Sequence, residues 1–355
     1  MTAPRDGSIA PVQRVAVVGL GRAGVAHAVM LTHIPGVELA AVADPRAAAR
    51  QALRGMGFSV PAFGRVERLL ERLQPDAVFV CAAQHERARV ARLVLEAGIP
   101  VLVERPMALT LAEAEELVQL ASARNVAFAV GHPLAYEPVF ARVHELVHAG
   151  VLGETRSARS AMFVSRVFAR PPRGAGRLDP RRVAGGVVAH LASDLLFVLV
   201  RMLGVPVEAR ATWSMLYGAV EDELHGMMTL RDGVEVGFDC SWSVPGYMRA
   251  STVIELTGRD GKLLASDEAL ELDLARPVGD LPAGYSRTRE ADFPAPARFD
   301  FGGETLWMHD AAFLEWAAGG TAPLNQASAA LVAHRVMDAL YRSAAAGGIT
   351  VTVAP

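Results

Sequence analysis

The chain has 355 residues, 52% of them hydrophobic, and a formal net charge of −3 at pH 7. This length allows two domains with a large core, and the dispersed charges argue against the basic surface of a nucleic-acid-binding protein. Charged residues interrupt every apolar run of about 18 residues and the first residues lack a signal-peptide pattern, so we expect a cytoplasmic protein that spans no membrane.

Residues 1–13 are expected to form a flexible leader. The chain then reads as a buried strand, Val15 to Val18, followed at once by a Gly-x-Gly-x-x-Gly turn and helix-forming residues. In such a turn Gly19 allows the tight bend, Gly21 lets the backbone approach a pyrophosphate, and Gly24 lets the helix pack on the strand. The free N–H groups of the helix N-terminus complete a predicted anion site.

A second apolar strand, Leu39 to Ala43, ends in Asp44, 20 residues after Gly24. A carboxylate at this point can accept hydrogen bonds from both ribose hydroxyls of NAD, and its charge repels the 2′-phosphate of NADP. Arg46 could attract that phosphate. The sequence therefore favours NAD as the cofactor and leaves NADP open.

Strands and helices continue to alternate as far as residue 137, with a capping box at Thr110 and Glu113. This pattern predicts a doubly wound α/β Rossmann domain over 14–137, in which ligands bind outside the carboxyl ends of the strands. The residues that fall at that edge are Gly19, Asp44, Gln84, His85, Glu104, Arg105 and His132.

Residues 138–353 have a different pattern, which predicts an α+β domain with a mainly antiparallel sheet. We expect an apolar helix over 185–203, long strands between 207 and 265, a hairpin turn at 231–234, helices over 305–318 and 326–346, and a closing strand at 349–353. The stretch 275–303 has no clear period and is expected to be a long irregular excursion. The loop 165–182 holds six arginines, among them Arg177, which would suit an anionic substrate, although a charged loop is usually only solvated.

Several motifs follow one another between Arg14 and Val353. They are the glycine-rich turn, D-A-V-F-V-C-A-A-Q-H from Asp76, V-L-V-E-R-P-M-A-L-T from Val101, G-H-P-L-A-Y-E-P from Gly131, A-G-V-L-G-E from Ala149, L-T-G-R-D-G-K-L from Leu256 and A-A-A-G-G-I-T-V-T-V from Ala344. On these motifs the chain resembles the Gfo/Idh/MocA family of NAD(P)-dependent sugar oxidoreductases. The resemblance implies hydride transfer between a nicotinamide and a hydroxyl or carbonyl of a sugar-like small molecule. It also implies a homodimer or homotetramer joined through the C-terminal sheet.

Two positions depart from the family pattern. The family usually has Glu-Lys-Pro, with a catalytic and substrate-anchoring lysine, where this chain has Arg105 between Glu104 and Pro106. The family helix usually places an aspartate four residues before a histidine, whereas here His190 precedes Asp194 by four. Arginine is a fixed cation and a poor proton donor. We therefore expect Arg105 to anchor the substrate. The alternative is that the site no longer needs the lysine and that arginine replaced it without a role of its own.

His190 and Asp194 are predicted to project from one helix face, with His190 as the acid/base and Asp194 orienting it or the substrate. A structural core pair is the alternative. The cofactor site is expected to comprise Gly19, Leu20, Gly21, Arg22, Ala23, Gly24, Asp44, Pro45, Arg46, Ala82, Ala83, His85, Glu104 and Arg105. The substrate site is expected to comprise Arg105, His132, Tyr136, Arg177, His190 and Asp194, with no metal.

Two other functions stay open. One is a redox-neutral lyase, hydrolase or epimerase that cycles NAD internally, as some relatives do. The other is a non-catalytic protein that senses a nucleotide or a sugar. A net change in absorbance at 340 nm with substrate would separate the oxidoreductase from both.

Overall fold

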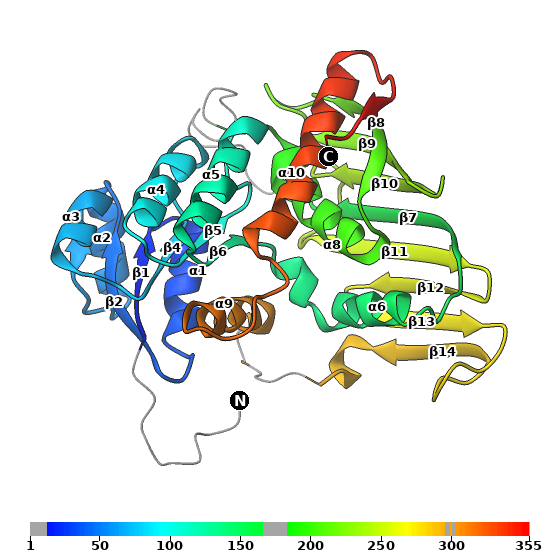
Figure 1. The fold of residues 1–355 in the computed structure, drawn as a ribbon, viewed down its shortest axis with the longest axis horizontal. Helices are drawn as coiled ribbons and strands as arrows, with labels where there is room; N and C mark the ends of the chain where they lie inside the picture. The colour runs from blue at the N-terminus through cyan, green and yellow to red at the C-terminus, as the bar shows by residue number, and fades with distance from the viewer. Residues whose placement is uncertain (1–12, 166–182, 295–298, 300–302, 355) are drawn as a thin grey trace. The chain divides into compact units, whose positions relative to one another are not determined.

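The computed structural model describes residues 13–165, 183–294, 299 and 303–354, and the chain divides into two compact units (Figure 1). Unit 1 consists of Met1–Met107, Glu115–Gly131 and Phe299–Ala327, and unit 2 consists of Ala108–Ala114, His132–Arg298 and Ser328–Pro355. Unit 1 differs from the continuous stretch 14–137 expected from the sequence, because a segment near the C-terminus belongs to it. Of the expected leader, residues 1–12 lie outside the described residues, and Gln13 is the first residue of a strand.

Within the described part of unit 1, six parallel strands form one sheet in the order β3-β2-β1-β4-β5-β6. Their bounds are β1 Gln13–Val18, β2 Val37–Ala43, β3 Ala62–Phe63, β4 Ala77–Val80, β5 Val101–Glu104 and β6 Phe128–Gly131. The order reverses between β1 and β4, which is the point where a doubly wound sheet binds dinucleotides. Every residue of β4 is 0% exposed, as expected of a strand covered on both faces. The predicted Rossmann fold is confirmed.

The helices that belong wholly or mostly to unit 1 are α1 Arg22–Leu31, α2 Ala47–Gly55, α3 Val66–Arg72, α4 Gln84–Glu96, α5 Leu111–Arg124 and α9 Glu304–Ala317. Helix α9 packs against α1, and its Phe313 and Leu314 are part of the buried core. The ring of Phe313 meets that of Phe79 on β4 edge to face, with 5.4 Å between centroids. This apolar contact explains why residues 299–327 fold with the dinucleotide-binding sheet.

Unit 2 contains, among its described residues, a sheet of nine strands in the order β14-β13-β12-β11-β7-β10-β9-β8-β15. Their bounds are β7 Thr155–Phe163, β8 Pro206–Ser214, β9 Glu223–Leu230, β10 Glu235–Ser241, β11 Ser251–Gly258, β12 Gly261–Ser266, β13 Ala269–Leu274, β14 Gly284–Arg289 and β15 Val351–Thr352. Only the β7–β10 pair is parallel within these ranges, so the predicted, mainly antiparallel α+β domain is confirmed.

The irregular excursion expected over 275–303 is wrong in part. Residues Gly284 to Arg289 form β14, which pairs with β13. No apolar alternation marks this strand in the sequence, because β14 lies at the edge of the sheet and most of its side chains are exposed. The hairpin turn predicted at 231–234 is confirmed, and there the N–H of Val234 donates to Oδ1 of Asp232 at 3.2 Å.

Helices cover one face of the unit 2 sheet (Figure 1). They are the 3₁₀ helix η1 Pro133–Tyr136, α6 Pro138–His148, the π-helical turn η3 Val188–Ala192, α8 Ser193–Leu203 and α10 Ala327–Ala345. Helix α6 packs on β12 and β13, η3 packs on β10, and the N–H of Ala211 on β8 donates to Oγ of Ser343 on α10 at 2.9 Å. The predicted capping box is present at the start of α5, since Thr110 and Glu113 each accept the other's backbone N–H. Across the described ranges, no helix is long and apolar enough to cross a membrane.

Candidate active site

The glycine-rich turn joins β1 to α1 as predicted. Gly19 has a φ of +96°, and a Cβ there would lie 2.5 Å from the carbonyl carbon of Cys81; a Cβ on Gly24 would overlap the carbonyl oxygen of Gly19. In contrast, a Cβ on Gly21 would meet no described atom within 4 Å. Gly21 is the N-cap of α1, whose first turn has neither a side-chain cap nor an acidic residue. The open approach to Gly21 and the uncapped N–H groups fit the pyrophosphate of a dinucleotide.

Asp44 follows β2 and is 3% exposed. The N–H of Leu20 donates to its Oδ2 at 2.7 Å, and Arg46 donates from Nε to Oδ1 at 2.9 Å and from Nη2 to Oδ2 at 2.8 Å. Burial raises the pKa of the Asp44 carboxyl, but the hydrogen bonds from Arg46 and Leu20 outweigh burial and lower it. Asp44 is therefore an ionised carboxylate beside the glycine-rich turn, and Arg46 is held against it.

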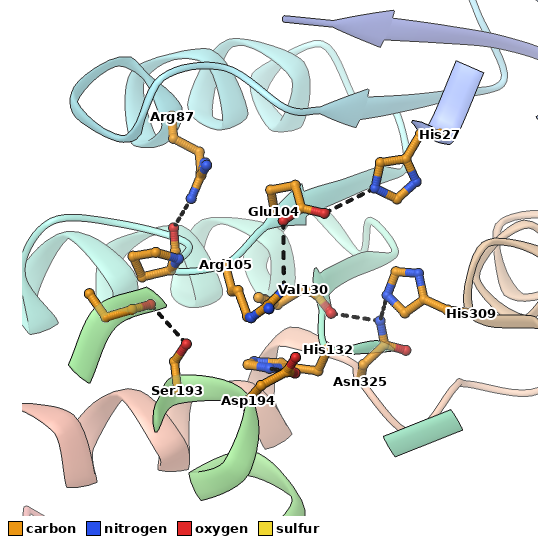
Figure 2. Close-up of polar contacts among 12 residues, drawn as sticks. His27, Arg87, Glu104, Arg105, Val130, His132, Ser193, Asp194, His309 and Asn325 are labelled. Atoms are coloured by element: carbon orange, nitrogen blue, oxygen red, sulfur yellow. Dashed lines mark hydrogen bonds and ion pairs between the residues drawn. The ribbon is translucent and has the colours of Figure 1, made fainter. Parts of the chain in front are cut away.

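The segment after β4 also lies at the carboxyl edge of the sheet. Ala82 and Ala83 precede α4. The sequence after the buried strand favours a loop over residues 83–86, but His85 lies in the first turn of α4, because the helix already begins at Gln84. The buried side chain of Arg87 donates from Nε to the carbonyl of Ala82 at 3.3 Å. It also donates from Nη1 to the carbonyl of Pro106 at 2.7 Å, the contact drawn at Arg87 in Figure 2. Arg87 thus ties together the segments that follow β4 and β5.

Glu104 is the last residue of β5, and its side chain is 13% exposed. Its Oε1 lies 3.0 Å from Nε2 of His27 on α1, and its Oε2 lies 3.9 Å from Nη1 of Arg105 (Figure 2). Burial raises the pKa of the Glu104 carboxyl, but His27, Arg105 and Arg87 outweigh burial and hold that pKa at about 2. An ionised carboxylate therefore stands at the carboxyl edge of the sheet.

In unit 2, His132 and Asp194 form a buried pair. His132 comes directly after β6 and Asp194 lies in the first turn of α8, and Nδ1 of His132 is 3.2 Å from Oδ1 of Asp194. The His132 ring stacks on Phe197 of α8, with 4.2 Å between centroids and 4° between planes. The sequence analysis expected Asp194 to orient His190, and it did not foresee the hydrogen bond to His132. Tyr136, the last residue of η1, is half-buried.

The helix expected over 185–203 begins with the π-helical turn η3. The N–H of Ser193 donates to the carbonyl of Val188, five residues earlier, and the Ser193 hydroxyl donates to the carbonyl of Ala189 at 2.8 Å (Figure 2). The hydroxyl therefore satisfies the carbonyl that an α-helix would pair with the Ser193 N–H. His190 lies in this turn, half-buried, with its ring centroid 5.8 Å from that of Trp242. Turns of this kind occur frequently at functional sites.

Glu221 anchors the start of η3. Its Oε1 accepts the N–H groups of Gly186 at 2.7 Å and Val188 at 3.2 Å, and the hydroxyl of Tyr341 at 2.8 Å. Burial raises the pKa of both the Glu221 carboxyl and the Tyr341 hydroxyl. The carboxylate holds the backbone that leads into the turn, so the position of His190 depends on it.

The structure brings the predicted residues together within each unit. In unit 1 the residues of the expected cofactor site lie at or beside the carboxyl edge of the parallel sheet; in unit 2, His132, Tyr136, His190 and Asp194 lie on or next to η1, η3 and α8. Arg177 and its neighbouring arginines lie outside the described residues. Over the described ranges, no three His, Cys, Asp or Glu residues are grouped as metal ligands. Sequence reasoning missed His27, Glu221 and Ser193. Their only signal in the sequence was that His27 and Ser193 are polar residues in apolar helices and that Glu221 is an acidic residue in a loop.

A parallel sheet with a glycine-rich turn after β1 and an acidic residue after β2 defines a dinucleotide-binding protein. Two family models match the chain: the NAD-binding Rossmann fold of the oxidoreductase family GFO/IDH/MocA over residues 13–132, and the GFO/IDH/MocA C-terminal domain over residues 140–264. The chain belongs to the GFO/IDH/MocA oxidoreductase family. The predicted cofactor, NAD, and the predicted enzyme class, an oxidoreductase, are confirmed.

Known relatives are similar over different shares of the chain. Inositol 2-dehydrogenase of Corynebacterium glutamicum is 24% identical over 85% of this chain and 84% of its own length. Myo-inositol 2-dehydrogenase of Thermotoga maritima is 28% identical over 49% of this chain, and the match spans half of that relative's length. Among solved structures, GenD2 from gentamicin A biosynthesis, in complex with NAD, is 25% identical over all of both chains with a TM-score of 0.81. Levoglucosan dehydrogenase in complex with NADH shares the fold, with a TM-score of 0.84 over 96% of this chain and 99% of its own, at 19% identity.

Proposed function

We propose that the chain is an NAD-dependent dehydrogenase or reductase that acts on a CH–OH or carbonyl group of a sugar-like small molecule. When bound, NAD supplies hydride transfer at the nicotinamide. The relatives support the substrate class, because their names refer to inositol and to 1,5-anhydro-D-fructose. The observation that carries the proposal is a polar set in unit 2: His190 and Asp194 lie in mainly apolar helical turns, and His132, just before η1, contacts Asp194.

In this proposal His190 moves the proton. Of the two histidines in the set, His190 is half-buried whereas His132 is 3% exposed and stacked on Phe197, so His190 is the better placed to meet a substrate. An imidazole can take or give a proton near neutral pH. The buried His132–Asp194 pair holds the helix that carries His190, and Asp194 keeps the role of orienting group through that pair.

Arg105 is proposed to anchor the substrate. Its guanidinium keeps its charge at every working pH and offers several N–H donors to a hydroxyl pair or a carboxylate. Its side chain is 21% exposed, so a bound molecule can reach it. An anionic sugar, such as a uronic acid, is the finer proposal.

The test follows NADH absorbance at 340 nm with myo-inositol, levoglucosan and glucuronate as probes. We expect turnover with at least one neutral polyol or uronic acid. His190→Ala should lower kcat by about 10² to 10⁴, the usual value of a positioned proton donor or acceptor, and leave NADH affinity unchanged. Arg105→Lys should raise KM and change kcat little, because a point charge replaces a planar fork.

The matched control is His148→Ala, which removes an exposed histidine on α6 and should leave all constants unchanged. Full turnover in His190→Ala would remove the acid/base assignment. Consumption of a probe without a net change at 340 nm would point to the redox-neutral alternative, and NADH binding with no reaction of any probe would favour a sensing protein. The assembly and the cytoplasmic location stay predictions.

A further inference from the structure

A chain of buried polar groups crosses unit 1 from β5 to the segment after α9. His27 contacts Glu104 through Nε2 at 3.0 Å and Asp310 through Nδ1 at 2.8 Å. Nδ1 of His309 lies 2.9 Å from the other oxygen of Asp310, and its Nε2 lies 2.8 Å from Nδ2 of Asn325. All but Glu104 are 0% exposed. Figure 2 shows both ends of this chain, at Glu104–His27 and at His309–Asn325.

The direction of each hydrogen bond follows from Asn325. Its Nδ2 also lies 2.6 Å from the carbonyl oxygen of Val130, so this atom must be the amide nitrogen, because an amide oxygen there would face another oxygen. It therefore donates to both neighbours, and Nε2 of His309 is an acceptor. His309 is then neutral with its proton on Nδ1, which it donates to Asp310.

This assignment leaves His27 between two carboxylates. A neutral imidazole has only one N–H, so its other nitrogen would face a carboxylate oxygen without a proton unless that carboxyl were protonated. A protonated His27 donates to both and needs no protonated acid. Burial lowers the pKa of His27, but Asp310 and Glu104 outweigh burial and raise it to about 10.

The other ionisable groups around this chain agree with a buried cation. Arg105 and Arg87 lie on the Glu104 side of His27. The pKa of the Cys81 thiol is raised by burial and by the charges of Glu104 and Asp310, so this thiol stays neutral. The ring of Phe79 closes one side of His27, with 5.2 Å between centroids. The pKa of His27 is raised from 6.5 to about 10, so the charged His27 stabilises the folded state. This stabilisation is complete below pH 6.5 and is lost as the pH rises through about 10.

We propose that His27 is a positioning residue for the dinucleotide site: as a buried cation tied to Asp310 of α9, it holds Glu104 ionised and fixed at the carboxyl edge of the sheet. A fixed carboxylate there can accept hydrogen bonds from the hydroxyl or amide donors of a bound nicotinamide nucleotide. The chain of bonds also makes the returning segment 299–327 part of the site's support, although Asp310 need not touch a ligand. The inference rests on the NAD site of the proposed function and does not depend on the substrate.

The first experiment reads the protonation state of His27 directly. In protein labelled with ¹⁵N-histidine, long-range ¹H–¹⁵N spectra distinguish the imidazolium from each neutral tautomer, and the signal missing in His27→Gln assigns the residue. We expect His27 to be an imidazolium throughout pH 6 to 8.5, a range over which an ordinary histidine, with a pKa of about 6.5, loses its proton. In Asp310→Asn, which keeps the shape and removes a charge, the pKa of His27 should fall into this range. A neutral His27 at pH 7.5 in the wild type would overturn the proposal.

The second experiment measures NADH affinity by calorimetry at pH 7.5 and 5.5. The wild type should bind equally at both values, because the pKa of Glu104 is held at about 2. His27→Gln should bind about tenfold more weakly at pH 7.5, the effect of losing one charged hydrogen bond, and weaker still at pH 5.5, because the pKa of buried Glu104 then rises toward this range.

The matched control is Leu314→Ala, which removes a buried side chain of α9 that is 2% exposed and leaves the polar chain intact. It should lower the melting temperature without adding a pH dependence to NADH binding. Equal NADH affinity of His27→Gln and wild type at both pH values would also overturn the proposal. If His27→Gln does not fold, Asp310→Asn provides the same affinity comparison. If the protein turns over no polyol but shows the imidazolium and the pH-dependent NADH affinities described above, the proposed function is contradicted and this inference is supported.

Discussion

At Asp44 the cofactor preference depends on how one carboxylate divides its hydrogen bonds. Both its oxygens accept from Arg46, while Oδ2 also accepts the N–H of Leu20. The sequence presented Asp44 and Arg46 as competing signals for NAD and NADP. The structure places them in one ion pair, so the arginine is held by the residue that disfavours the 2′-phosphate.

We expect Asp44→Asn to weaken NADH binding by about tenfold, because charged hydrogen bonds to the ribose are lost. NADPH binding should stay equal or become tighter, since the repelling charge is gone and Arg46 is released. Calorimetric titration of both cofactors into both proteins measures the change. Arg46→Ala is the control, because it frees Asp44 and should weaken only NADPH. Equal loss of both cofactors in Asp44→Asn would show that Asp44 merely supports the turn.

The π-helical turn is the element whose shape sets the positions of His190 and Asp194. Ser193 stabilises it with two bonds, one from its N–H to Val188 and one from its hydroxyl to Ala189. Without the hydroxyl, the buried Ala189 carbonyl loses its donor, which costs about 1 to 3 kcal/mol. An α-helical turn would satisfy that carbonyl again, but it would rotate the residues before Ser193, including His190, about the helix axis.

Ser193→Ala should therefore lower kcat with any probe that the wild type turns over, and leave NADH affinity unchanged. Ser343→Ala is the matched control, because Ser343 is a buried serine of α10 that also makes two hydrogen bonds, to Ala211 and Ile349. Both variants should lose similar stability in a thermal melt. If the two variants have the same kcat, the shape of the turn has no role in catalysis.

Local patterns predicted most of the elements, because apolar runs and glycines mark buried strands and turns whatever lies far away. The glycine-rich turn, the capping box at Thr110 and the hairpin at 231–234 are of this kind. The sequence could not show β14, whose edge position removes the apolar alternation, or η3, whose π register depends on one serine hydroxyl. The polar residues Gln84, His85 and Glu86 also favoured a loop in the sequence, whereas they form the first turn of α4.

The candidate site was predictable only where its residues are close in sequence. Asp44 follows the glycine-rich turn at a known spacing, so its place beside Leu20 could be expected. The pairs His132–Asp194 and His27–Asp310 are separated by 62 and 283 residues, and no local pattern relates their members. A lone histidine in the apolar helix α1 was a weak signal, and its meaning required the position of α9.

At the scale of the whole molecule, the open face of the unit 2 sheet carries the last prediction. Helices cover one face, and the oligomer that the family resemblance implies would be joined through the other. This face is mixed, because Arg159, Asp239 and Glu255 of the central strands are exposed on it, and Arg159 lies opposite Glu255 in the β7–β11 register. Exposed apolar side chains lie both on strands of the sheet, at Leu264 of β12 and Tyr285 of β14, and in the segments after β8 and β10, among them Met215 and Met248.

We still expect a homodimer or homotetramer joined through this face, now with a mixed surface in which charged pairs flank the half-buried Ala161 and Val253. Light scattering after gel filtration at micromolar concentration should give two or four times the mass of one chain. Ala161→Arg should dissociate the assembly, because an unpaired charge at the centre of an interface costs several kcal/mol, whereas Gln51→Arg on α2 of unit 1 adds the same charge elsewhere and should not. Charge pairing also predicts weaker assembly at 1 M than at 0.1 M salt, since the screening length falls from about 10 to about 3 Å. A monomeric wild type would contradict the prediction, and an assembly unaffected by Ala161→Arg would move the interface to another surface.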